Sequence, residues 1–252
     1  MLKHVTRQSS AAAIDLSAGL PIGDAKAQAV RKMFDTISGR YDLVNRVMTF
    51  GLDTRWRKRA VSMLGLAAGA RVLDVAAGTG DFCRDLEARG LTPIGMDFSW
   101  GMLANARTAA PLVQCDALRL PVGDGLVDGV TCGFALRNFV DLPTFFGEIA
   151  RVVRPGGRIA LLDASAPSQP ILRLGHRIYF TNVVPRVGGL LSDRTAYRYL
   201  PKSLAYIPEP PVLLGWLRDA GFSGAQRHIF LGGAAHLFVA TRASANPGQT
   251  NE

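Results

Sequence analysis

The chain has 252 residues, of which 48% are hydrophobic, and a formal net charge of +9. This length fits one large domain, or one domain with a modest appendage, and supplies enough apolar side chains for a core without disulfides. No apolar run approaches the roughly 18 residues that a membrane-spanning helix needs, and the opening segment lacks the apolar stretch of a secretory signal. Three scattered cysteines, Cys83, Cys115 and Cys132, show no metal-ligand spacing, so we expect no metal site, a reducing compartment and a cytoplasmic protein.

Basic residues flank a nearly neutral centre. Residues 31–59 hold eight Lys and Arg against three Asp and Glu, residues 169–242 hold nine against three, and residues 60–168 hold nine against eleven. The basic stripe with interleaved aromatics that is typical of nucleic-acid binders is missing, so no nucleic acid is expected as a partner. Two interpretations of the flanks stay open: contact with an anionic membrane surface, or an ordinary solvated basic surface.

The first part of the chain predicts helices without a strand. Residues 1–24 are rich in Ser, Ala and Gly and are expected to form a disordered tail. An amphipathic stretch over 25–47 and a helix over 54–64 follow, so residues 25–65 form a helical segment ahead of the first strand.

From Arg71 onward, short β-branched runs alternate with helical patterns, which is typical of a parallel sheet built from βαβ units. Ser99 is a suitable N-cap for the helix after the second strand, and Pro155-Gly156-Gly157 predicts a turn before the fifth strand. The expected strands are 71–76, 92–97, 112–115, 126–134 and 158–163, with helices ending near 90, over 99–106 and over 142–153.

The alternation stops over residues 169–208, which carry aromatics, prolines and arginines and predict an inserted cap. It resumes with a helix over 211–220 and strands over 225–231 and 235–241, and a second disordered tail is expected over 243–252. The fold class is therefore α/β, a Rossmann-like doubly wound sheet in one domain over 25–242.

The most informative motif is Val72-Leu-Asp-Val-Ala-Ala-Gly-Thr-Gly-Asp81, an apolar strand that ends in a glycine turn. Such a turn lets the backbone approach a ligand at the carboxyl end of a parallel strand. Asp97 ends the second strand and is placed to accept hydrogen bonds from two ribose hydroxyls. Asp116, beside Ala117, ends the third and suits an adenine amine. A dinucleotide site is the competing interpretation, but Cys83 stands where that fingerprint requires its third glycine.

The chain resembles the quinone-biosynthesis C-methyltransferases, which methylate demethylmenaquinol and polyprenyl-benzoquinol, from about Val30 to His236. The most specific parts of the resemblance are the Tyr-Asp…Asn…Trp-Arg segment, the Leu-Arg-Asn turn and the Ala-Tyr-x-Tyr-Leu-Pro-x-Ser run, at 41–57, 136–138 and 196–203. The resemblance implies a class I methyltransferase fold with S-adenosylmethionine as the methyl donor. It implies donor-binding residues among Asp74, Gly78, Thr79, Gly80, Asp97, Phe98, Asp116, Ala117 and Gly133.

The chain departs from that family's pattern at several positions. Gly133 stands where the family tends to have serine, which removes one hydrogen bond to the donor. Asp163 replaces a glutamate, Asp53 replaces a histidine, and His236 is shifted relative to the usual C-terminal histidine. These departures leave methyl transfer as the expected reaction and leave the acceptor open.

Methylating a quinol ring carbon requires an electron-rich carbon aligned with the methyl group. We expect Arg137 and Asn138, which follow the fourth strand, to orient the acceptor hydroxyl or a water that takes its proton, with Arg137 stabilising the phenolate. The alternative is a structural role in the loop. Tyr41, Asp42 and Asn45 are expected to form a lid that excludes water, or else to serve only in helix packing.

The insertion offers an apolar wall for an isoprenoid tail, with arginines that could face lipid headgroups; a homodimer contact would use the same residue types. Its members are Phe180, Val183, Val184, Leu190, Tyr197 and Tyr199, with Arg173, Arg177 and Arg186 as neighbours. The predicted function is methylation of a prenylated quinol, with demethylmenaquinol first. The alternatives are a polyprenyl-benzoquinol, another small aromatic acceptor, or a non-catalytic member that binds the donor or a lipid as a scaffold.

Overall fold

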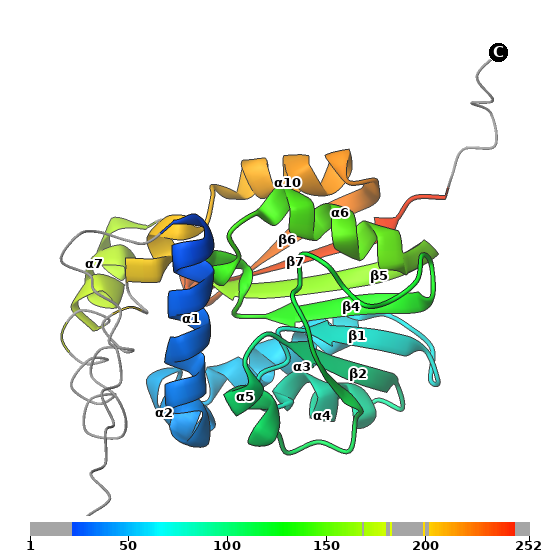
Figure 1. Cartoon of the computed structure of the whole chain (residues 1–252). Helices are drawn as coiled ribbons and strands as arrows, with labels where there is room; N and C mark the ends of the chain where they lie inside the picture. Colours follow the sequence, from blue (N-terminus) through cyan, green and yellow to red (C-terminus); the bar gives the residue numbers. More distant parts are fainter. Residues whose placement is uncertain (1–21, 168, 180–181, 183–198, 200–201, 245–252) are drawn as a thin grey trace, which may run out of the picture.

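A seven-stranded sheet forms the centre of the molecule in the computed structural model, which describes residues 22–167, 169–179, 182, 199 and 202–244. The strand order is β3-β2-β1-β4-β5-β7-β6; the first five strands are parallel and β7 is antiparallel to both of its neighbours (Figure 1). This confirms the predicted α/β class. The strands are β1 (Arg71–Val75), β2 (Thr92–Asp97), β3 (Leu112–Gln114), β4 (Val127–Gly133), β5 (Val153–Ala164), β6 (Phe222–Phe230) and β7 (Ala235–Arg242).

Helices cover both faces of the sheet. One apolar cluster joins α6 (Leu142–Val152) and α10 (Pro210–Asp219) to one face, and a second joins α3 (Leu52–Leu64) and α4 (Asp81–Glu87) to the other. A third, smaller cluster joins α1 (Gly23–Ile37) to α5 (Trp100–Ala104). The remaining elements are η1 (Ser38–Arg40), α2 (Tyr41–Met48), η2 (Leu136–Asn138), α7 (Pro170–Ile178), η4 (Leu204–Tyr206) and η5 (Leu231–Gly233).

Most of the predicted strands agree with the structure to within a residue or two. Three differences concern two helical segments and one turn. Ser99 caps α5 as predicted, accepting the Met102 N–H, but the helix ends at Ala104 rather than near 106. The stretch over 25–47 is two helices, because η1 interrupts it. Pro155-Gly156-Gly157 lies inside β5 as a bulge: Val127 pairs with Val153, and the next pair is Gly129 with Arg158.

The described elements nearest to the expected domain limits, 25 and 242, are α1 and β7. Helix α1 begins at Gly23, inside the predicted N-terminal tail, and β7 ends at Arg242. The insertion is described at α7, at η4 and at a few further positions. The wall residues Phe180, Val183, Val184, Leu190 and Tyr197, together with Arg186, lie outside the described residues. No helix within the described part of the chain has the length and apolar character to cross a bilayer.

Candidate functional site

Two adjoining cavities open at the carboxyl ends of the parallel strands, between the sheet and the helices α1 and α2. The larger has a volume of about 440 Å³ and the smaller about 130 Å³. Tyr41, Ala76, Gly78, Gly133 and Phe134 line both, so the two form one continuous site. This is the end of an open α/β sheet at which ligands bind.

Two residues of the shared wall have a strained backbone. Ala76 (φ +58°) and Phe134 (φ +59°) directly follow the neighbouring strands β1 and β4, and both adopt the left-handed conformation that costs a non-glycine residue about 1–2 kcal/mol. Because both residues line both cavities, the strain is located where the two cavities meet. Neither residue was singled out from the sequence.

The glycine turn lies between β1 and α4. The Gly78 N–H donates to Asp97 Oδ2 at 2.8 Å, which ties the turn to the end of β2. Gly80 has a φ of +82°, and a Cβ there would lie 2.7 Å from Thr108 Cγ2, so both conformation and space require glycine. Thr79 is buried, and its hydroxyl donates to Asp42 Oδ1 on α2. The turn is therefore fixed by two hydrogen bonds, to Asp97 at the end of β2 and to Asp42 on α2.

The smaller cavity has the features of a nucleoside site. Each oxygen of the Asp97 carboxylate accepts one backbone N–H, from Gly78 and from Ser99, both at 2.8 Å. Because each carboxylate oxygen has two lone-pair sites, acceptor capacity beyond these backbone bonds remains for a ribose hydroxyl. Burial raises the pKa of Asp97, against these backbone hydrogen bonds. The predicted residues Phe98, Asp116, Ala117 and Gly133 line the same cavity.

Side-chain packing explains why position 133 is a glycine. A Cβ on Gly133 would lie 2.6 Å from Cε2 of Phe82, whose ring is buried against the sheet. A serine hydroxyl therefore does not fit here unless Phe82 moves. Phe82 fills space that the family's usual serine would need.

Asp74 is a buried carboxyl in the wall of the larger cavity. Thr131 Oγ1 donates to it at 3.0 Å and Cys83 Sγ at 3.5 Å. Burial raises the pKa of Asp74 to about 7, partly opposed by these two hydrogen bonds. The group therefore titrates near neutral pH.

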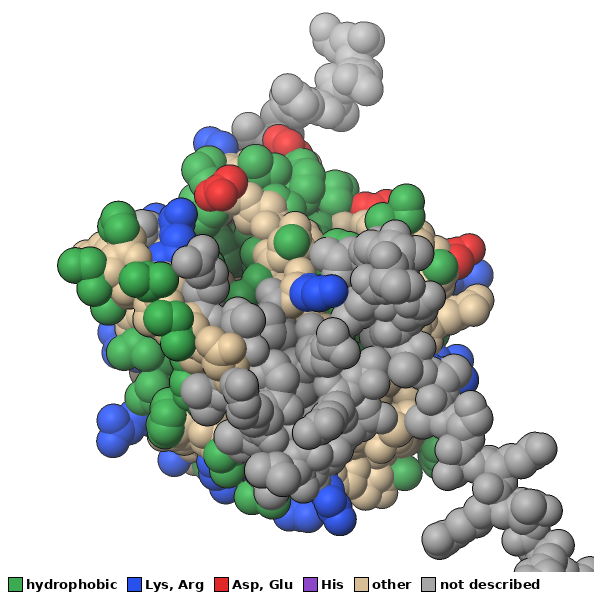
Figure 2. All heavy atoms as spheres, turned by 90° about the vertical axis from the view of Figure 1, so that its left-hand side faces the viewer, with side chains coloured by type: hydrophobic (Ala, Val, Ile, Leu, Met, Phe, Trp, Pro, Cys, Tyr) green, Lys and Arg blue, Asp and Glu red, His purple; other side chains and the backbone are tan. Residues whose placement is uncertain are grey.

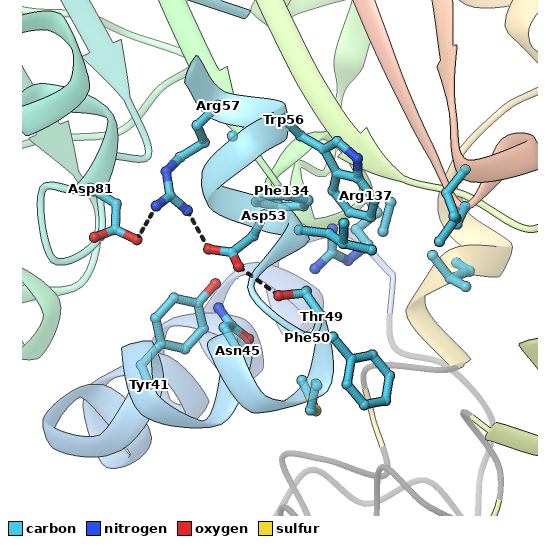
Figure 3. A pocket seen from close by; sticks show the side chains of 18 of the residues that line it. Tyr41, Asn45, Thr49, Phe50, Asp53, Trp56, Arg57, Asp81, Phe134 and Arg137 are labelled. Carbon is cyan, nitrogen blue, oxygen red and sulfur yellow. Dashed lines mark hydrogen bonds and ion pairs between the residues drawn. The ribbon is translucent and has the colours of Figure 1, made fainter. Parts of the chain in front are cut away.

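A cluster of ion pairs forms another wall of the larger cavity (Figure 3). Arg57 on α3 is only 6% exposed and binds three carboxylates: Asp53 at 2.7 Å, Asp81 at 2.9 Å and Asp85 at 3.1 Å. Thr49 Oγ1 also donates to Asp53, at 2.6 Å. Burial opposes ionisation of Asp53, but the Thr49 hydrogen bond and the Arg57 charge together hold its pKa below the usual value. Sequence reasoning assigned no role to this cluster, although the Asp53–Arg57 spacing of four on a helix is a usable signal.

The three residues expected to form the lid lie together at the site. Tyr41 lines both cavities and Asn45 lines the larger, whereas Asp42 reaches the site through its hydrogen bond with Thr79. Tyr41 is partly buried, and desolvation of its hydroxyl raises its pKa against the opposing charge of Arg137. Helix α2 is thus fixed to the glycine turn and covers the point where the cavities meet.

Arg137 and Asn138 are adjacent in sequence but line different cavities. Arg137 lines the larger one and is held by the fully buried Asp163, whose carboxylate accepts the Arg137 backbone N–H at 3.0 Å and forms an ion pair with Arg137 Nη1. Asn138 lines the smaller one, and its side-chain oxygen accepts the hydroxyl of the buried Tyr199 at 3.3 Å. Tyr199 therefore supports the wall without lining it, and Tyr197 lies outside the described residues.

Apart from these polar groups, the larger cavity is mostly apolar. Trp56 stacks on Phe230 with 6.2 Å between ring centroids and also contacts Phe134. Apolar side chains from α2, α7 and η5 complete the wall: Met48, Phe50, Ile171, Leu172, Tyr179 and Leu231. An aromatic ring with an apolar substituent matches this lining better than a charged metabolite does.

Comparisons with known proteins give the site its context. The model of the ubiE/COQ5 methyltransferase family matches residues 22–242. A demethylmenaquinone methyltransferase of Deinococcus radiodurans is 42% identical over 84% of this chain and 93% of its own length, and one of Thermus thermophilus is 43% identical over 81% and 97%. A ubiquinone/menaquinone biosynthesis C-methyltransferase of Syntrophotalea carbinolica is 37% identical over 85% and 94%.

Solved structures agree at the level of the fold. A phosphoethanolamine N-methyltransferase 2 of Haemonchus contortus, in complex with S-adenosyl-L-methionine, superposes with a TM-score of 0.57 at 16% identity, covering 75% of this chain and 53% of its own. The putative methyltransferase in a complex with the Trm112 activator of Haloferax volcanii gives 0.58 at 18%, covering 84% and 99%. The match of the family model over residues 22–242, with relatives at 37–43% identity over most of the chain, shows that the chain belongs to the ubiE/COQ5 methyltransferase family.

Proposed function

We propose that the protein transfers a methyl group from S-adenosylmethionine to a ring carbon of a prenylated quinol, with demethylmenaquinol as the first acceptor. The observation that carries the proposal is the larger cavity, an apolar and aromatic chamber of about 440 Å³ with the buried cation Arg137 in its wall. The names of the most similar relatives support the same acceptor. A polyprenyl-benzoquinol is the second candidate, because a relative with 37% identity is named for ubiquinone as well as menaquinone biosynthesis.

The residues present fit a cationic donor. Three carboxyl groups, those of Asp53, Asp74 and Asp81, line the larger cavity against two guanidinium groups, and both arginines are already bound to carboxylates. The wall therefore carries surplus negative charge that a ligand with ammonium and sulfonium groups would neutralise. The smaller cavity, with Asp97 and Asp116, would hold the nucleoside end. When bound, the donor would supply an electrophilic methyl group: its sulfur–methyl bond would break to leave a neutral thioether, and the ring carbon would gain the methyl group and then lose its proton.

The chain's own residues would make the ring carbon nucleophilic. Asp163 engages only Nη1 and the backbone N–H of Arg137, so among the described residues the other guanidinium donors have no side-chain partner. Those donors would bind the acceptor oxygen and stabilise the phenolate that forms when its proton leaves. Asn138, whose side-chain oxygen accepts the Tyr199 hydroxyl, would form part of the wall between the acceptor ring and the nucleoside end of the donor. Tyr41, Asp42 and Asn45 would keep water out as the lid.

Donor binding should depend on pH through Asp74. This carboxyl has its pKa raised to about 7, and a cation bound beside it would favour the ionised form, so binding should release a proton. The sign follows: because the ionised carboxylate binds the cation, Asp74 should make donor affinity fall as the pH drops below 7, by up to about tenfold per unit. Isothermal titration between pH 5.5 and 8.5, in two buffers of different ionisation enthalpy, measures both effects. The Asp74→Asn variant should show a flatter profile; an unchanged profile would remove Asp74 from the linkage.

The acceptor is tested by comparing catalytic efficiencies. Reduced demethylmenaquinone, a reduced demethyl-benzoquinone with a prenyl tail, and a tail-free naphthoquinol should be offered to the protein with the donor. We expect the first to have the highest kcat/KM. A higher kcat/KM for the benzoquinol would reverse the order of the candidates. Donor binding without turnover of any acceptor would favour the scaffold alternative.

Contact with a membrane belongs to this proposal, because a prenylated acceptor resides in a bilayer. Formation of a homodimer stays a prediction from the sequence.

A further inference from the structure

We propose that an exposed apolar surface around the mouth of the larger cavity docks on an anionic phospholipid bilayer. This inference rests on the proposed function, since a prenylated acceptor must be taken from a membrane. The entrance surface, as we name it, comprises Val47, Phe50, Ile171, Leu174, Ile178 and Leu231, which are between 42% and 85% exposed.

The entrance surface is continuous although its residues come from three separate segments. The ring of Phe50, just after α2, lies 5.6 Å from that of Tyr179 at the end of α7, and the Tyr179 hydroxyl donates to the Met48 carbonyl at 2.9 Å. At the other end, a Cβ on Gly232 in η5 would lie 2.5 Å from Leu172 of α7. Helix α7 therefore bridges α2 and η5.

The surface is also continuous with the cavity. Phe50, Ile171 and Leu231 line the larger cavity and are nevertheless 78%, 85% and 64% exposed. They form its rim, so an apolar tail leaving the cavity would pass directly onto the entrance surface. Leu174 and Ile178 extend the surface along α7 without lining the cavity. Monomeric proteins rarely leave this many large apolar side chains together in water without a partner for them.

The charges around the entrance surface suit anionic lipid. Residues 164–179, which include α7, contain Arg173 and Arg177 and no Asp or Glu, and residues 43–52 contain Arg46 and no acid. Figure 2 shows this side of the molecule: hydrophobic side chains gather on its left, Lys and Arg side chains lie above and below them, and the acidic side chains lie toward the top and right. An amphipathic helix with basic neighbours is the usual form of a peripheral membrane contact.

A second copy of the chain fits this surface less well. In a two-fold dimer the same patch meets itself, so a rim of net positive charge would face a rim of the same charge. An anionic bilayer instead supplies the opposite charge along the whole rim.

Vesicle flotation tests the proposal with the full-length protein. Vesicles of phosphatidylglycerol and phosphatidylethanolamine should bind the wild type, with affinity that falls as salt rises, and pure phosphatidylcholine vesicles should bind it more weakly. The Leu174→Ser/Ile178→Ser variant should bind the anionic vesicles at least tenfold more weakly. The matched control is Leu126→Ser/Val212→Ser, two side chains of similar exposure, 50% and 43%, at other places on the protein. It should bind like the wild type.

Activity measured in the same experiment separates this proposal from the proposed function. With a tail-free naphthoquinol in solution, the Leu174→Ser/Ile178→Ser variant should keep the wild-type rate, whereas with demethylmenaquinol in vesicles its rate should fall at least tenfold. Wild type that methylates the soluble acceptor but fails to bind anionic vesicles would overturn the docking surface and leave the function standing. Wild type that binds vesicles but methylates no quinol would overturn the function. A dimer that dissociates in the Leu174→Ser/Ile178→Ser variant would assign the surface to a second copy and overturn lipid docking.

Discussion

The double variant Arg137→Gln/Asp163→Asn is expected to lower kcat about 100-fold or more, while the donor Kd changes by less than about threefold. The reason is electrostatic: one preorganised donor directed at a developing oxyanion is worth about 10²–10³ in rate, and a neutral amide cannot replace the guanidinium charge. The double change is used because Asp163 is fully buried beneath Arg137. Removing the arginine alone would leave a buried carboxylate without its counter-charge, at a cost of about 3–5 kcal/mol.

The control for this experiment keeps a carboxylate at position 163. Asp163→Glu carries the longer acid that the family usually has, and it should keep Arg137 charged and paired and retain turnover within about tenfold. Turnover in the double variant near the wild-type rate would exclude Arg137 from the chemistry. A loss of donor binding as large as the loss in kcat would place Arg137 at the donor site.

The second large effect is expected at Asp97. Asp97→Ala should raise the donor Kd tenfold or more, equivalent to at least about 1.4 kcal/mol, because the acceptors for the ribose hydroxyls are lost. The structure adds a further cause: the same carboxylate accepts the Gly78 and Ser99 N–H groups, so the glycine turn loses its anchor as well. Calorimetry of donor binding measures the change.

Two further variants serve as controls for the Asp97→Ala measurement. Asp97→Asn keeps one acceptor oxygen and should weaken binding less than alanine does. Asp124→Ala removes a 79% exposed carboxylate that binds Arg151 outside both cavities, and it should leave the Kd unchanged. Unchanged affinity in Asp97→Ala would mean that the donor does not occupy the smaller cavity.

The alternation of strands and helices along the chain and the position of the glycine turn could be predicted because they depend on local patterns, whereas the order of the strands in the sheet and the antiparallel β7 depend on long-range pairing and were not predicted. Alternating β-branched runs predict parallel strands, and Gly78 and Gly80 mark the place where the backbone must turn. Asp97 and Asp116 were found because each directly follows a strand, and the carboxyl ends of parallel strands meet at one edge of the sheet. The bulge at Pro155-Gly156-Gly157 was not predicted, since it depends on the pairing of β4 with β5.

The rest of the site depends on contacts between distant segments. The sequence showed Asp163 only as a departure from a family pattern, whereas the fold places it under Arg137, 26 positions earlier. Arg57 and Asp85 are 28 positions apart and meet only when α3 lies beside α4. Arg137 and Asn138 are consecutive residues of η2 and line different cavities, which a linear motif does not reveal.

The central claim, transfer of a methyl group to a quinol ring carbon, is tested most directly by the mass and fragmentation of the product. The purified protein should be incubated in detergent with a donor whose methyl group is trideuterated and with chemically reduced demethylmenaquinone. We expect a product in which one ring hydrogen is replaced by the labelled methyl group, with the label retained on the ring after fragmentation. A label on oxygen, or no labelled product from a protein that binds the donor by calorimetry, would contradict it.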